Sequence, residues 1–448
     1  MKKLIAVILA VIVTAASTFV LCSCKDGGKT KSDNDKQSGE VSSEASATVS
    51  DDGSAGSSAG QSTPQSVEEP DDDEPMPEVP VLSEGLEYAI NEFMHNAYTV
   101  TGIGTFSGQH LVIPDTYEDL PVTGIAKKAF MGKNVLRSVI IPDSVTDIDD
   151  QAFYVCKKLK TVIIGKGLKT LGYGTFLECE SLESVSVDKE NPDFYSAGNC
   201  IIKRDTGKLY VACLASVIPD DGSVTSIDAD AFVGLKNLTG IHIPASVTDI
   251  AVNTFAYCPR LESITVADGN EVFYSEGNCL IKRDGLLLSG CLASVIPDEV
   301  TAIADNAFVG CTGLTSVHIP DGVTNVGEMA FSGCTSLKTV TFGENCRLTA
   351  VKSYTFYYCL ALENVVLPEG VTTIGQGAFC GCAGLKSITI PAGVTSIGDI
   401  AFNSCKALTT INFGGTVAKW NAMQKGDGWK FNVPATCVVN CVNGTATI

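Results

Sequence analysis

The sequence lacks the motifs on which common enzyme sites depend. It has only four histidines and two tryptophans among 448 residues. No nucleophile elbow, zincin motif, phosphate loop or dinucleotide fingerprint appears in the structural context that such a motif requires. The paired carboxylates at Asp149-Asp150 and Asp220-Asp221 fall at expected turns, where aspartate is common anyway. The sequence therefore predicts a protein that is not an enzyme and uses no cofactor.

Positive charge is also scarce. The chain has 31 Lys and Arg against 51 Asp and Glu, giving a net charge of −20. Nucleic-acid binding requires clustered Lys and Arg to contact phosphates. The charge balance therefore predicts that nucleic acid is not a partner.

Long apolar runs are limited to the N-terminus. Basic Met1-Lys2-Lys3 precedes the apolar stretch Leu4 to Leu21, which is typical of an export signal. The following Leu21-Cys22-Ser23-Cys24 resembles a lipobox, with Cys24 as the lipidated residue. We interpret residues 1–24 as a lipoprotein signal peptide and expect a lipid anchor in a bacterial membrane. A plain signal peptide and an uncleaved membrane anchor are the alternatives.

Residues 25–82 have almost no large apolar side chains and are rich in Ser, Gly, Asp, Glu and Pro. Such a segment cannot bury enough surface to offset its ordering entropy, so we expect a disordered linker. Between Lys25 and Glu84 there are 15 acidic residues and 4 lysines, a net charge of −11. A flexible chain of this length spans roughly 40 Å, and charge repulsion extends it further. The linker would hold a folded domain away from the membrane.

A repeat organises the rest of the chain. A small residue followed by Phe recurs at spacings of 23, 23, 56, 23, 53, 23, 25, 23 and 23. A fixed period in this range is the signature of a solenoid. The marker phenylalanines are Phe130, Phe153, Phe176, Phe232, Phe255, Phe308, Phe331, Phe356, Phe379 and Phe402.

Each repeat contains one clear β-strand. Around Leu314, Val317 and Ile319, apolar residues alternate with Ser316 and His318, which is strand periodicity. One repeat cannot bury its own apolar residues, so repeats must stack. Stacking places these strands side by side in a parallel sheet, with neighbours roughly 4.8 Å apart.

The consensus I-G-x-x-A-F-x-x-C-x-x-L-x-x-V-x-I-P-x-x-V-T resembles the bacterial leucine-rich repeats of BspA-like surface proteins. The resemblance covers about residues 86–448 and implies a β-rich leucine-rich repeat solenoid with a parallel sheet on one face. We expect an N-terminal cap at 83–125, the solenoid at 126–414 and a C-terminal cap at 415–448. The resemblance also implies adhesion, with fibronectin and fibrinogen as typical ligands of the family.

The two long spacings contain near-copies of one insertion. We expect each to form a β-hairpin, turning at Asp205–Gly207 or Asp284–Gly285. The following Ser-Val-Ile-Pro pieces, 216–219 and 294–297, are expected to be extra strands of the solenoid. Insertions in repeat proteins often form the binding face, but these hairpins could equally patch a bend. In the C-terminal cap, Trp420 and Trp429 would cover the solenoid end or, alternatively, form a sugar platform.

Eight of the 18 cysteines stand three residues after a marker Phe, which is not a metal-binding spacing. We expect a buried column of free structural thiols, with disulfides between repeats as the alternative. Three further pairs could bond locally in an exported protein, although sequence cannot fix connectivity. These pairs are Cys200 with Cys213, Cys279 with Cys291, and Cys437 with Cys441.

His242 and His318 occupy the same outward position in their repeats, as a paired metal site would. Counting strands places them about 14 Å apart. Since Zn–N bonds are about 2 Å long, one ion cannot bridge them. We therefore predict no metal site.

The outward strand positions form the predicted binding face, dominated by hydroxyls with little charge. A Ser/Thr ladder selected only for strand propensity is the alternative. We expect apolar anchors at Ile140, Ile163 and Val366. The predicted face comprises Ile140, Ile163, His242, Thr265, Ser316, His318, Thr339, Thr341, Val366 and Thr389.

These observations together predict a monomeric, lipid-anchored bacterial surface protein that binds proteins or glycans of host or neighbouring cells. One alternative is a surface lipoprotein that captures polysaccharide or peptide for uptake. Another is a structural component of the envelope. A face rich in exposed aromatic residues would favour glycan capture, and the predicted face has few.

Overall fold

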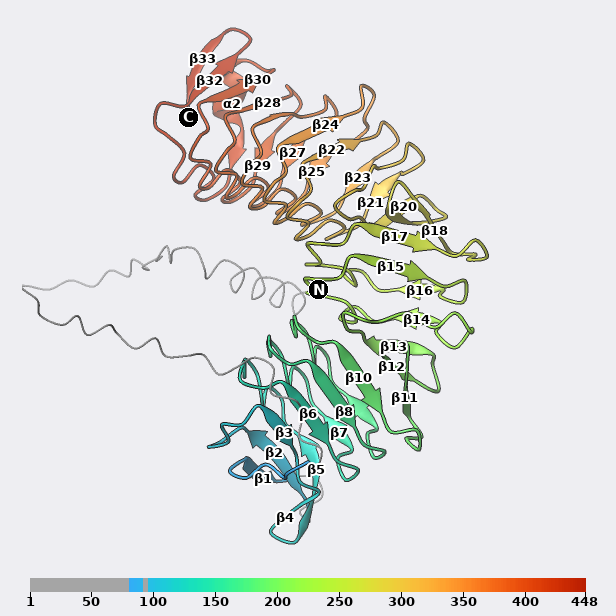
Figure 1. Cartoon of the computed structure of the whole chain (residues 1–448). Helices are drawn as coiled ribbons and strands as arrows, with labels where there is room; N and C mark the ends of the chain where they lie inside the picture. The colour runs from blue at the N-terminus through green and yellow to red at the C-terminus, as the bar shows by residue number, and fades with distance from the viewer. Residues whose placement is uncertain (1–79, 92–95) are drawn as a thin grey trace, which may run out of the picture. The chain divides into compact units, whose positions relative to one another are not determined.

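The computed structural model describes residues 80–91 and 96–448. The predicted signal with Cys24, and nearly all of the predicted linker, lie outside these residues. Within the described part, no helix is both long and apolar enough to span a membrane. The described chain is a solenoid in which each turn, called a rung below, contributes one long and one short strand (Figure 1).

The long strands pair in parallel, in register from one rung to the next. The expected single sheet is divided into three, because the two insertions interrupt the stacking. The first sheet contains β3 (His110–Val112), β6 (Ser138–Ile141), β8 (Thr161–Ile164) and β10 (Ser184–Val187), and the second contains β15 (Gly240–Ile243) and β17 (Ser263–Val266). The third contains β22 (Ser316–Ile319), β24 (Thr339–Phe342), β26 (Asn364–Val366), β28 (Ser387–Ile390), β30 (Thr410–Phe413), β32 (Val438–Cys441) and β33 (Gly444–Thr447).

The short strands form a second series of sheets on another wall of the solenoid. Most have two residues, one of which is buried. They are β7 (Asp147–Ile148), β9 (Thr170–Leu171), β14 (Ser226–Ile227), β16 (Asp249–Ile250), β21 (Ala302–Ile303), β23 (Asn325–Val326), β25 (Ala350–Val351), β27 (Thr373–Ile374), β29 (Ser396–Ile397) and β31 (Gln424–Lys425).

Both ends carry additional elements. At the N-terminal end, β1 (Glu87–Ile90) and β2 (Tyr98–Gly102) form the expected antiparallel pair. β2 also pairs in parallel with β5 (Leu120–Ile125), which in turn pairs with β4 (Thr116–Tyr117). At the C-terminal end, α2 (Val417–Ala422) begins at the N-cap Thr416. Trp420 and Trp429 are both buried and pack edge-on at 6.1 Å between ring centroids. Neither indole therefore offers the open ring face that a sugar platform requires.

Each insertion forms three antiparallel strands rather than the expected two. They are β11 (Phe194–Ala197), β12 (Cys200–Lys203) and β13 (Lys208–Val211) in the first, and β18 (Phe273–Glu276), β19 (Cys279–Lys282) and β20 (Leu286–Ser289) in the second. The turns at Gly198-Asn199 and Gly277-Asn278 have positive φ at both residues, as a tight hairpin turn requires.

The prediction of extra strands after the insertions is wrong. Residues 216–219 and 294–297 lie in no strand. The Val217 N–H donates a hydrogen bond to the Gly198 carbonyl, because the hairpin turn stands between this segment and β10. The equivalent Val295 N–H bonds to the Gly277 carbonyl.

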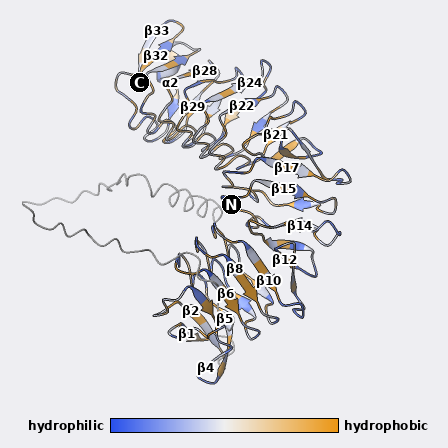
Figure 2. Ribbon diagram, in the orientation of Figure 1, coloured by the Kyte–Doolittle hydropathy of each residue, from blue (hydrophilic) through white to orange (hydrophobic). Residues whose placement is uncertain are grey.

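The interior is apolar, and its most regular feature is the column of marker phenylalanines. From Phe308 to Phe402, successive rings stack with centroids 5.0 to 5.5 Å apart. Burial alternates along the long strands: Val317 and Ile319 are buried, whereas Ser316 and His318 are exposed. Figure 2 shows the resulting alternation of hydropathy along the ribbon.

The cysteine column has a specific role. In seven rungs the buried thiol donates a hydrogen bond to the carbonyl oxygen of the marker Phe of the preceding rung, at 3.1 to 3.3 Å. Cysteine thus fits a small buried space, and its thiol gives a second hydrogen bond to a carbonyl that also accepts a backbone N–H. Every cysteine of the described residues is a free thiol, so the considered local pairs are not bonded in this structure.

Candidate functional site

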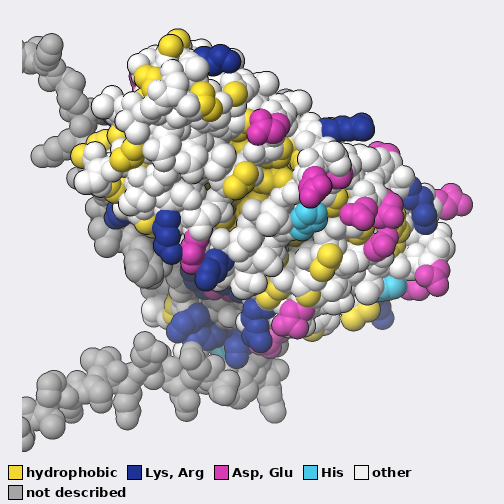
Figure 3. Space-filling view, turned by 90° about the horizontal axis from the view of Figure 1, so that it is seen from above, with side chains coloured by type: hydrophobic (Ala, Val, Ile, Leu, Met, Phe, Trp, Pro, Cys, Tyr) yellow, Lys and Arg dark blue, Asp and Glu magenta, His cyan; other side chains and the backbone are white. Residues whose placement is uncertain are grey.

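The long-strand face, meaning the outward side chains of the long strands, is the candidate site. Successive side chains of a strand point to opposite faces of the sheet. Because the apolar side chains point into the core, the residues between them point outward and form this face. Figure 3 shows acidic and basic side chains scattered over one view of the molecule, with hydrophobic side chains exposed between them.

Six of the ten predicted residues lie on the seven-stranded sheet. Ser316 pairs in register with Thr339, and His318 with Thr341, across β22 and β24. Val366 on β26 pairs with Thr389 on β28.

The other four residues lie elsewhere. Ile140 and Ile163 are in register on β6 and β8 but are half-buried, so they offer less apolar surface than a free anchor. His242 and Thr265 lie on the two-stranded sheet of β15 and β17. The insertions separate these three groups, so the predicted face is not one continuous surface.

Hydrogen bonds between rungs fix the histidines of the face, which we did not predict. His318 Nδ1 lies 2.9 Å from Thr341 Oγ1, and His242 Nδ1 lies 2.9 Å from Thr265 Oγ1. In both pairs the threonine lies 23 residues after the histidine, which is one repeat length. The repeat period alone could therefore have identified the partner of each histidine. The imidazoles are held as part of a polar ladder.

A similar ladder of opposite charges runs beside the face. Glu363 forms ion pairs with Lys338 at 3.2 Å and Lys386 at 3.0 Å, on the rungs before and after it. The Lys386 and Lys338 hydrogen bonds lower the pKa of Glu363. The ladder is exposed and its stabilising effect is small, but it places both charge signs next to Thr339 and Asn364.

Val366 is the one strongly exposed apolar side chain among the predicted face residues, with 65% of its surface accessible. Its neighbours are polar, since Asn364 precedes it on β26 and accepts a hydrogen bond from Ser387 at 2.6 Å. The result is a hydroxyl and amide surface on which Val366 is the most exposed apolar side chain, with Val438 on β32 exposed to 43%.

The polar ladder of this face offers hydrogen-bond donors and acceptors to a ligand. Among residues 80–91 and 96–448, no three His, Cys, Asp or Glu side chains are grouped as a metal site requires. The His–Thr distances suit a base and a nucleophile. However, no hydrogen bond among the described residues orients the second ring nitrogen of His242 or His318.

The repeats match a known family model. Residues 106–199, 210–280 and 301–423, more than half of the chain, match the BspA type leucine rich repeat region in six copies. The chain belongs to the BspA-type leucine-rich repeat family. No curated protein matches the chain significantly.

Solved structures of this repeat class are similar to the chain. A leucine rich cell surface protein from Faecalibacterium prausnitzii is 29% identical, with 79% of this chain and 99% of that chain covered and a TM-score of 0.52. The pneumococcal vaccine antigen PcpA is 19% identical, with coverage of 81% and 93% and a TM-score of 0.51. At that identity, the second likeness shows the fold alone.

Proposed function

We propose that this chain is a non-catalytic adhesin-like protein of the bacterial cell surface, which binds a protein ligand through the seven-stranded part of the long-strand face. The N-terminal segment 1–24, with lipidation at Cys24, would attach it to the membrane. The similar protein of Faecalibacterium prausnitzii is described as a cell surface protein, which supports this location.

The observation that carries the proposal is Val366, exposed on β26, the third strand of the seven-stranded sheet, among pre-ordered polar side chains. Binding energy in protein interfaces concentrates on a few central anchors surrounded by near-neutral polar contacts. The hydrogen-bonded ladders on either side reduce the entropy lost on binding, because their side chains are already ordered. Glu363 and its two lysines add charges of both signs at the rim.

The test is a binding screen of the full chain displayed on cells, against arrays of matrix proteins and glycans. Val366→Lys should weaken a protein hit at least tenfold, which corresponds to about 1.4 kcal/mol. Val295→Lys is the matched control, because Val295 is 71% exposed but lies after the second insertion, in a segment that belongs to no strand. The control should bind like the parent chain.

Three outcomes would overturn the proposal. A protein hit that survives both Val366→Lys and a triple change of Ser316, Thr339 and Thr341 to Lys would move binding off this face. A hit to glycans alone would instead support polysaccharide capture, and a displayed chain that binds nothing would favour a structural role in the envelope.

A further inference from the structure

The two insertions interrupt the short-strand sheets in the same way, and each leaves a junction. One sheet ends at β9 and the next contains β13, whereas the second junction lies between β16 and β20. The insertions are close copies: Asn191 and Asn270 are buried and donate to equivalent carbonyls of the preceding rungs. The chain therefore contains two versions of one junction.

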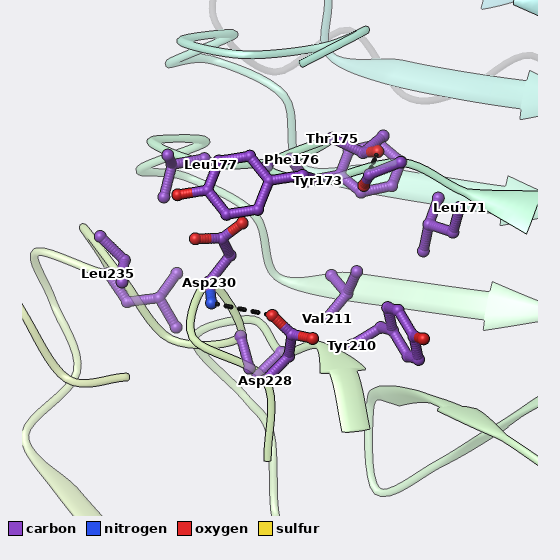
Figure 4. Close-up of a pocket in the computed structure, with 15 residues that line it drawn as sticks. Leu171, Tyr173, Thr175, Phe176, Leu177, Tyr210, Val211, Asp228, Asp230 and Leu235 are labelled. Atoms are coloured by element: carbon purple, nitrogen blue, oxygen red, sulfur yellow. Dashed lines mark hydrogen bonds between the residues drawn. The ribbon is translucent and has the colours of Figure 1, made fainter. Parts of the chain in front are cut away.

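The first junction encloses a cavity of about 160 Å³, whereas the hollow at the second measures about 10 Å³. Figure 4 shows the first cavity between the rung of Tyr173 and the rung of Asp230. Its walls include the side chains of Leu171, Tyr173, Tyr210, Val211, Asp228 and Asp230.

The sequences explain this difference. The second junction has Val252 in place of Tyr173, Leu288 in place of Tyr210, Ala304 in place of Asp228 and Asn306 in place of Asp230. The insertion by itself therefore requires neither a cavity nor carboxylates. The tyrosines and aspartates are particular to the first junction.

The first cavity has unbalanced negative charge. The Asp228 carboxylate is paired with Lys208, whose Nζ also lies 5.2 Å from the Tyr210 ring centroid. Among the described residues no cation forms an ion pair with Asp230, and its buried Oδ2 has no hydrogen-bond partner. Burial and the neighbouring Asp228 charge raise the pKa of Asp230 to about 7, although Tyr173, the Gly174 backbone and the Lys208 charge act in the opposite direction. A second cation in the cavity would relieve this cost.

We propose that this cavity binds a primary ammonium group at the end of an alkyl chain, with the Asp230 carboxylate as its counter-ion. The rings of Tyr173 and Tyr210 present aromatic surface to the cation. The apolar side chains of Leu171 and Val211 line the same cavity and can contact the methylene groups. A lysine side chain of another protein and a free diamine share this chemistry.

A divalent cation fits this cavity less well. Calcium takes six to eight oxygen ligands. Here Lys208 already neutralises one of the two carboxylates, and the described residues contain no group of three metal-binding side chains. The proposal is independent of the long-strand face, because the cavity adjoins the short strand β9 and the insertion strand β13.

The test is calorimetric titration of the full chain at pH 7 with N-acetyl-lysine methylamide and, separately, 1,5-diaminopentane. At least one should bind with a Kd in the millimolar range. Because a bound cation lowers the pKa of Asp230, binding should release protons, which is seen as a dependence of the heat on the buffer. Binding of both ligands would admit a lysine side chain, and binding of the diamine alone would identify a free amine.

Substitutions that introduce the residues of the second junction into the first provide a more specific test. Asp230→Asn and Tyr173→Val should each weaken binding tenfold or more. Asn306→Asp, which changes the second junction, should leave it unchanged. The proposal is overturned if neither amine binds at concentrations up to about 50 mM. It is also overturned if Asp230→Asn binds the amines as well as the parent chain does, or if calcium binds at this cavity and excludes the amines.

Discussion

The C-terminal run of rungs and the interrupted middle of the solenoid are built from the same repeat, yet they pack differently. Between Phe308 and Phe402, neighbouring marker rings lie within 16° of parallel. In the middle, the Phe232 and Phe255 rings are tilted by 43°. The uninterrupted repeats therefore have a regular core column, whereas the two rungs that lie between the insertions have a less regular one.

The largest effect is expected when one marker phenylalanine in each region is replaced by alanine. Phe356→Ala should cost about 3–5 kcal/mol of unfolding free energy, because a fully buried aromatic is lost. Phe356 stacks on both Phe331 and Phe379, whereas Phe232 packs only against Phe255 among the marker rings described. We expect Phe232→Ala to cost about 1 kcal/mol less, since one aromatic contact fewer is lost.

Denaturant unfolding of the full chain, followed by circular dichroism, measures both changes. Equal or larger destabilisation by Phe232→Ala would show that regular stacking adds nothing beyond burial.

A smaller effect is expected in the cysteine column. Cys382 donates to the Phe356 carbonyl at 3.1 Å, whereas Cys311, beside the second insertion, has only a 3.9 Å contact with the Gly290 carbonyl. Cys382→Ala removes one of the two hydrogen bonds to the Phe356 carbonyl, which also accepts from the Cys359 N–H, and should cost about 1 kcal/mol. Cys311→Ala should cost less. Thermal unfolding of the two variants tests this order, and a reversed order would contradict a role for the thiol hydrogen bond.

The fold was predictable because its signals recur. The marker Phe and the alternation around Val317 and Ile319 specify a stacked solenoid at every rung. The division of the long strands into three sheets was not predictable. It depends on the hydrogen bond between the turn at Gly198-Asn199 and residues 216–219, which are distant in the sequence. The His318–Thr341 pair was within reach through the period, but the cavity at Asp230 arises between residues more than 50 positions apart and has no local signal.

The first junction should also show a pH effect that the second lacks. Folding raises the pKa of Asp230 to about 7, above its ordinary value near 4, so the folded chain binds this proton more tightly than the unfolded chain. The contribution of Asp230 to the free energy of unfolding is fully present below about pH 4 and is lost as the pH rises through about 7. Asp230→Asn should therefore stabilise the chain by about 1–3 kcal/mol at pH 8 and have little effect at pH 4.

Melting temperatures of the parent and Asp230→Asn between pH 4 and 8 provide the measurement, with Asn306→Asp as the reciprocal change. A constant difference between parent and Asp230→Asn across this range would mean that the carboxyl is not perturbed.

The smallest expected effect is a difference in unfolding free energy between substitutions on the first and the third long-strand sheets. Val366 is exposed on β26, so Val366→Lys should change the unfolding free energy by no more than about 0.5 kcal/mol. Ile163 is half-buried between neighbours on β8, and Ile163→Lys should cost about 1 kcal/mol or more, because apolar contacts are lost. Urea unfolding of both variants checks the contrast. If Val366→Lys destabilises as much as Ile163→Lys, then Val366 serves the core of its sheet, and a loss of binding in that variant could not be assigned to a missing surface anchor.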